Sequence, residues 1–107
     1  MMTSHHAELS RDMIHNRVED LIGQFFKILP MREHESPTLN QYISSLLLEM
    51  LGMQSLMLAW QNDGMYMSLV GILQYLLDHP ECDVPTVKRE IFRAISVIKL
   101  LQKKYTA

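Results

Sequence analysis

The amino-acid sequence predicts an all-α domain that consists of four helices. Apolar residues recur every three or four positions over long stretches, which is the spacing of one face of an α-helix. No stretch alternates convincingly with the two-residue period of a half-buried strand. Breaks that contain proline or glycine divide the chain of 107 residues, a length typical of one domain. We therefore expect a single compact domain over residues 1–107, with residues 1–7 disordered and helices at about 8–29, 37–61, 65–79 and 84–105.

The first helix, at about 8–29, has a continuous apolar face. Val18, Leu21 and Phe25 lie on this face, whereas Phe26 lies off it and adds apolar surface elsewhere. Pro30 is expected to end the helix, because proline disfavours the helical conformation of the preceding residue.

The second helix, at about 37–61, is apolar around most of its circumference. Ser36 is a good N-cap, and Pro37 suits the first helical position, where no backbone N–H is needed. From Leu46 to Trp60 only four small or polar residues interrupt the apolar side chains. Gly52 is one of them, and we expect the helix to continue through it, although glycine can also bend a helix at such a point.

Turn residues separate the last two helices from the rest of the chain. Asn62-Asp63-Gly64 has the composition of a turn and precedes the helix at about 65–79. Pro80 follows that helix directly. Asp83 is expected to cap the helix at about 84–105, because its short side chain can accept an N–H of the first turn.

The formal net charge is only −2, but the charges are unevenly distributed. Residues 33–83 hold seven acids and no Lys or Arg, whereas residues 84–107 hold six bases and one acid. The outer side of the last helix therefore forms a basic strip with two apolar members. Its candidate partner-binding residues are Lys88, Arg89, Phe92, Arg93, Lys99, Leu100 and Lys103.

Three interpretations of this basic strip remain open. It is a docking surface for an acidic partner or for nucleic-acid phosphates, a solvated outer face, or a contact with the acidic middle of a second copy. Phe92 and Leu100 favour docking, because a purely solvated face needs no apolar residue. Nucleic acid is the less favoured partner, because the strip is short and no glycine or aromatic RNA-binding motif accompanies it.

Methionine is unusually frequent, with nine residues, five of which lie between residues 50 and 67. Flexible Met side chains fill gaps in a core, or they line an adaptable interface. Four helices in a chain of this size cannot fully surround one of them, so the surplus apolar surface predicts a homodimer with helices one and two at its seam. The candidate dimer or groove residues are Phe26, Met50, Met53, Met57 and Trp60.

Residues with catalytic or metal-binding spacing are not apparent. Glu81 and Asp83 flank the single cysteine, Cys82, and negative neighbours raise the pKa of a thiol and lower its reactivity. The five histidines are not spaced to complete a tetrahedral site. We expect no enzyme activity, cofactor or metal. One cysteine and the absence of a signal peptide predict a cytoplasmic protein, and no segment is long and apolar enough to span a membrane.

Several residues resemble those of the small enterobacterial regulators of the AriR type, which are biofilm and acid-resistance connector proteins. The resemblance is carried by Ile14-His15-Asn16, Leu21, Phe25-Phe26, Glu35-Ser36, Leu39, Gln41 and Leu46-Leu47, and by the apolar pattern of 69–77 and 87–98. The stretch 52–62 has the character of an insertion relative to that group. The resemblance implies an all-helical homodimer that modulates a transcriptional response through protein contacts, with DNA binding as a further activity to test.

These features together favour a small non-enzymatic adaptor or regulator that acts through protein–protein contact in a bacterial transcriptional or stress response. Its expected partners are a second copy of itself and another protein. One alternative is a secretion or assembly chaperone that holds a client in a Met-lined groove. The other is a DNA-binding regulator that uses the basic side of the last helix.

Overall fold

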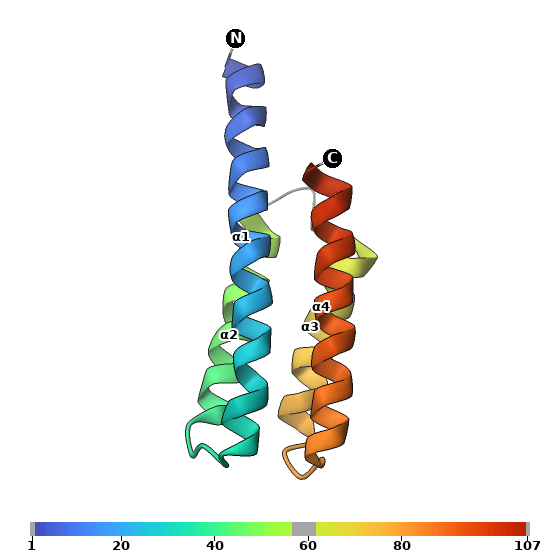
Figure 1. Cartoon of the computed structure of the whole chain (residues 1–107). Coiled ribbons are helices and arrows are strands. Elements are labelled where there is room, and N and C mark those ends of the chain that lie inside the picture. The colour runs from blue at the N-terminus through green and yellow to red at the C-terminus, as the bar shows by residue number, and fades with distance from the viewer. Residues whose placement is uncertain (1, 57–61, 107) are drawn as a thin grey trace.

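The computed structural model confirms the all-α class. It describes the backbone of residues 2–56 and 62–106, and the side chains of Asp12, of residues 15–55 and of residues 62–104. Within these residues the chain forms four helices and no strand (Figure 1). The helices are α1 (Met2–Glu33), α2 (Leu39–Leu56), α3 (Gly64–Asp78) and α4 (Val84–Thr106).

The helices run up and down in two layers. In Figure 1, α1 and α4 lie side by side in front, with α2 behind α1 and α3 behind α4. Each helix packs against the next one along the chain, and α4 closes the bundle against α1. The molecule measures 51 × 22 × 21 Å, and the first turns of α1 extend beyond the end of α4 (Figure 1). The bundle therefore has four sides, each shared by two neighbouring helices.

One apolar core runs along the bundle axis, and every helix contributes to it. Its members recur at the three- or four-residue spacing of a helix face, and Leu51 of α2 is an apolar residue that points outward instead. The buried apolar residues are Val18, Leu21, Phe25, Ile28, Leu29, Ile43, Leu46, Leu47, Met50, Tyr66, Leu69, Ile72, Leu73, Leu76, Val87, Ile91, Ala94, Ile95, Ile98 and Leu101.

The prediction that Pro30 ends the first helix is wrong. The helix continues for one more turn to Glu33, since proline deprives the backbone of only one hydrogen bond so close to the helix end. A Schellman motif closes this last turn: Ser36 N–H donates to the carbonyl of Met31 at 2.9 Å, and Glu35 N–H to that of Arg32 at 3.1 Å. Glu35 occupies the left-handed position of the motif, with φ of 52°, where glycine is usual.

Other helix boundaries differ by a few residues from the predicted ones. The backbone of α1 is helical from Met2, within the segment expected to be disordered. Ser36 Oγ accepts the N–H of Thr38 at 3.4 Å, but the regular helix α2 starts at Leu39, after a tight turn. This helix continues through Gly52 as expected, and the predicted end at about residue 61 lies outside the described residues.

The turn before α3 contains a buried carboxylate that joins the two layers. Asp63 caps α3 by accepting the N–H groups of Met65 at 2.8 Å and Tyr66 at 3.1 Å. Its other oxygen pairs with Lys104 Nζ of α4 at 2.7 Å. The cap of α4 is the predicted one: Asp83 accepts the N–H of Thr86 at 3.0 Å. Hydrogen bonds from the side chain and then from the backbone of Thr86 lower the pKa of the exposed Asp83 carboxyl.

Candidate protein-binding face

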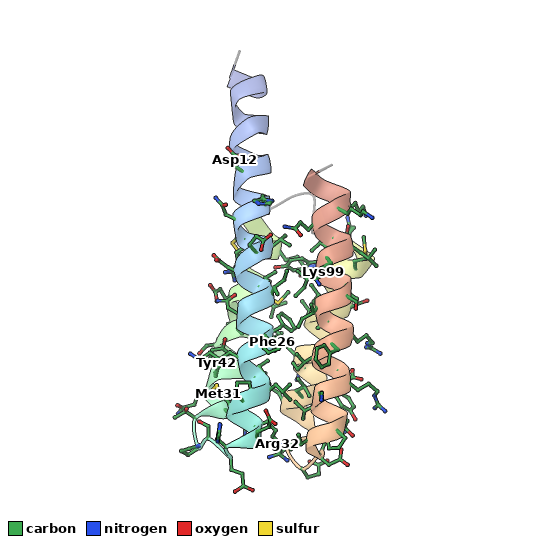
Figure 2. The ribbon with its side chains drawn as sticks, viewed as in Figure 1. Asp12, Phe26, Met31, Arg32, Tyr42 and Lys99 are labelled. Carbon is green, nitrogen blue, oxygen red and sulfur yellow. The ribbon has the colours of Figure 1, made fainter. Side chains whose placement is uncertain are left out.

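Large apolar side chains are exposed on the side of the bundle that α1 and α4 share. Phe26 of α1 and Phe92 of α4 are each 46% exposed, and Leu100 of α4 is 56% exposed. Phe26 and Lys99 lie along the seam between the two helices (Figure 2). We call this surface the α1–α4 face, and it consists of Ile22, Phe26, Phe92, Ser96, Lys99, Leu100 and Lys103.

The two phenylalanines form the apolar centre of the α1–α4 face. Their rings meet edge to face, with centroids 6.2 Å apart and planes at 87°. This contact holds each ring in place and still leaves nearly half of it accessible to solvent. Rigid, half-exposed aromatic rings lose little conformational freedom when a partner covers them, which is why such residues often dominate binding energy.

A shallow groove continues the face from the rings toward the end of α4. Its floor is apolar, with Ile22 of α1 opposite Leu100 of α4, and its rim carries Lys99 and Lys103. Glu19 is the acid that lines the groove, and its carboxylate accepts a hydrogen bond from Gln102 at 2.6 Å. The groove thus combines an apolar floor with a net positive rim.

The structure divides the predicted basic strip between two sides of the bundle. Lys99, Lys103 and the two apolar residues Phe92 and Leu100 flank α1 or point outward beside it. Arg93 lies toward α3 instead, in a depression that Tyr75 and Arg89 also line. Lys88 lies one helical turn before Phe92, which places it on the α1 side of α4, and its side chain is exposed.

The two arginines share one acidic neighbour. Arg89 Nε lies 3.6 Å from a carboxylate oxygen of Glu90, and a guanidinium nitrogen of Arg93 lies 3.5 Å from the other oxygen. Glu90 therefore offsets part of the positive charge on this side. The groove beside α1 keeps more of its positive charge, because the described salt bridges include neither Lys99 nor Lys103.

The predicted dimer or groove residues do not form one surface. Phe26 is exposed, but Met50 is completely buried, which corrects its assignment to an interface. Its backbone carbonyl accepts the hydroxyl of Tyr66 at 2.7 Å, and burial raises the pKa of that tyrosine to about 12. Met53 is half-buried against the same core, and Met57 and Trp60 lie outside the described residues.

The methionines therefore serve the core more than a groove. Met65 is half-buried and packs against the core like Met53. Met67 is exposed on the outside of α3, where its sulfur accepts a hydrogen bond from Gln54 at 2.8 Å. Among the described residues they do not line a common groove, so the chaperone alternative gains no support from this part of the chain.

The expected seam between helices one and two carries polar contacts. Arg17 of α1 pairs with Glu49 of α2 at 3.1 Å, and Tyr42 donates its hydroxyl to the carbonyl of Gln24 at 2.8 Å. The ammonium group of Lys27 lies 5.3 Å from the centre of the Tyr42 ring. The described contacts across this seam are thus mainly polar, whereas the large exposed apolar residues Leu48, Leu51 and Phe92 lie on other sides of the bundle.

Sequence reasoning did not identify the second exposed apolar surface. Leu48 is 68% exposed and Leu51 42% exposed, both on the outside of α2. The full apolar circumference of the second helix indicated an excess of apolar surface but not which residues would carry it. Ile22 of α1 is partly buried against the core and also lines the groove.

The remaining reactive side chains do not gather into a site among the described residues. Burial raises the pKa of the Cys82 thiol, Glu81 and Asp83 add to the rise, and Arg32 opposes it. Arg32 donates a 2.6 Å hydrogen bond to the Cys82 carbonyl and thereby ties α1 to the turn before α4. In the described part of the chain, three or more His, Cys, Asp or Glu residues nowhere come close enough to hold a metal ion.

Two further observations bear on the class of protein. In the residues that the structure describes, the helices are too short or too polar to cross a membrane. Comparison of the chain with protein-family models, with curated proteins and with solved structures found no match.

Proposed function

We propose that this protein is a small non-enzymatic adaptor or regulator that binds an acidic helical segment of another protein on the α1–α4 face. The observation that carries the proposal is the pair of half-exposed rings, Phe26 and Phe92, next to a groove with a lysine rim. Modulation of a bacterial transcriptional or stress response is the role that the resemblance to AriR-type regulators adds.

The chemistry of the groove supports an acidic amphipathic helix as the partner. A helix with apolar residues at every third or fourth position can cover the two rings and Leu100 with one side. Acidic residues beside that apolar stripe would then meet Lys99 and Lys103 at the rim. The lysine rim would disfavour a basic partner, which supports an acidic amphipathic segment as the ligand.

The test uses a synthetic amphipathic helix with leucines on one side and glutamates beside them, labelled with a fluorophore. Fluorescence anisotropy should show saturable binding to the wild-type chain. The same peptide with lysine in place of each glutamate should bind much more weakly. Reversal of both rim charges, Lys99→Glu with Lys103→Glu, should weaken binding of the acidic peptide about tenfold, because each rim charge contributes roughly 0.5–1 kcal/mol.

A matched control separates the two sides of α4. Arg89→Glu with Arg93→Glu changes the net charge by the same amount but lies nearer α3 and Glu90, so its effect should be smaller. Equal binding of the acidic peptide by the wild type and the Lys99/Lys103 variant would refute the proposal. Competition by a short DNA duplex, with affinity that falls steeply as salt rises, would instead favour the DNA-binding alternative.

A further inference from the structure

The outer surface of α2 and α3, on the opposite side of the bundle from the α1–α4 face, is apolar and almost uncharged. Ser44, Leu48 and Leu51 follow one another at helical spacing along the outside of α2. The outside of α3 presents Met67, and Gln74 two turns later. We call this surface the α2–α3 face, and it consists of Ser44, Leu48, Leu51, Met67, Val70, Gln74 and Leu77.

Contacts at both ends show that these residues form one continuous face. At one end, Gln54 of α2 donates its side-chain N–H to the sulfur of Met67 of α3 at 2.8 Å. At the other end, Ser44 of α2 and Leu77 of α3 line the same shallow depression. Leu48 and Leu51 lie between these two points on α2, so the exposed leucines occupy the middle of the face.

The lack of charge on the α2–α3 face favours a second copy of this chain as its partner. None of the seven residues that define it is ionisable, and Asp78, which accepts a hydrogen bond from Gln74 at 3.0 Å, lies at its border. A neutral face does not select a charged partner, and it can meet its own copy without like-charge repulsion. Interfaces between identical subunits are typically apolar and depleted of charge at their centre.

The dimensions of the face are sufficient for a pair of copies. The 18 residues of α2 extend over about 27 Å, and the bundle is about 22 Å wide. Two such faces in contact would cover roughly 1,200 Å², which is the lower end of the range for specific complexes.

We propose that the α2–α3 face joins two copies of this chain around a two-fold axis. The homodimer expected from the apolar excess is thereby placed on helices two and three instead of one and two. Because α1 and α4 form the other layer of the bundle (Figure 1), each copy in this dimer presents its α1–α4 face outward. If the proposed function holds, one dimer binds two acidic segments on opposite sides.

Light scattering coupled to size exclusion tests the dimer independently of any partner. The wild-type chain at about 100 µM should elute with twice the monomer mass of 12.5 kDa. Leu48→Glu with Leu51→Glu should elute as a monomer, because it places four carboxylates in the contact. Ser44→Arg should also elute as a monomer, because it places two guanidinium groups in the contact. If the Leu48/Leu51 variant loses its helical circular dichroism, the oligomeric state of Ser44→Arg tests the proposal instead.

Variants of the other side serve as the matched control. Phe92→Glu with Leu100→Glu should remain dimeric while it loses the acidic peptide, and the monomeric variants should bind that peptide with unchanged affinity. A monomeric wild type overturns the proposal, as does a dimer that persists in both α2 variants. Loss of the dimer only in the Phe92/Leu100 variant also overturns it, because self-association would then use the α1–α4 face.

Discussion

The two exposed apolar sides of the bundle differ in the charges around them. On the α1–α4 face the apolar residues adjoin Lys99 and Lys103, whereas none of the residues that define the α2–α3 face is ionisable. The two faces both expose large apolar side chains, but the difference in neighbouring charge predicts a different partner for each. The charged face can select an opposite charge in another protein, and the neutral face is compatible with its own copy.

The largest expected effect comes from breaking the connection between the two layers. Asp63→Ala should lower the free energy of unfolding by about 2–3 kcal/mol, because it removes the cap of α3 and leaves Lys104 without this carboxylate. Chemical denaturation measures this loss. Both faces should become less stable together, since Asp63 ties α3 to α4.

Two variants provide controls for the Asp63 prediction. Asp63→Asn keeps a capping oxygen and loses only the ion pair, so it should cost less. Asp83→Ala removes an exposed cap that takes part in none of the described salt bridges, so it should lower the melting temperature by less than Asp63→Ala does. Equal losses for Asp63→Ala and Asp83→Ala would show that the ion pair between Asp63 and Lys104 adds nothing to stability.

A second change weakens the packing between α2 and α3, the two helices that carry the α2–α3 face. Tyr66→Phe removes the hydrogen bond from α3 to the Met50 carbonyl of α2 and should cost about 1 kcal/mol. Because the folded-state pKa of Tyr66 is raised to about 12, the phenol contributes stability that is present below pH 10 and is lost as pH rises toward 12. Between pH 9 and 12, the free energy of unfolding obtained from chemical denaturation should therefore fall less steeply with pH for Tyr66→Phe than for the wild type.

Salt separates the two faces without any substitution. Binding of the acidic peptide should weaken about threefold between 50 and 300 mM salt, because ions screen the exposed lysine rim. Self-association through the α2–α3 face should not weaken over the same range, since none of its defining residues is ionisable. Parallel weakening of both would show that charges also hold the dimer together.

The smallest expected effect concerns the turn that leads from the α1 layer to the α2 layer. Glu35→Gly should stabilise the chain by about 0.5–1 kcal/mol, because glycine adopts the positive φ of this position without steric cost. Glu35→Ala is the control and should give no such gain, since alanine meets the same steric penalty. Thermal unfolding distinguishes the two, and both binding properties should stay unchanged.

The sequence by itself determined the class of fold, most of the core and the cap of the last helix. These features depend on residues close together in the sequence. An apolar helix face repeats every 3.6 residues, and Asp83 caps its helix by accepting the backbone N–H of Thr86, three residues later. The end of the first helix was harder to predict, because the tendency of Pro30 to end a helix competes with the hydrogen bonds of the turn that follows it.

Only the tertiary structure decided which exposed residues meet. Phe26 and Phe92 are 66 positions apart in sequence, and they touch because α4 closes the bundle against α1. The same packing turns Arg93 toward α3 and leaves Lys99 beside the groove. It buries Met50 and exposes Leu48, although both belong to one apolar helix, because neighbouring helices can cover only the side that faces the bundle axis.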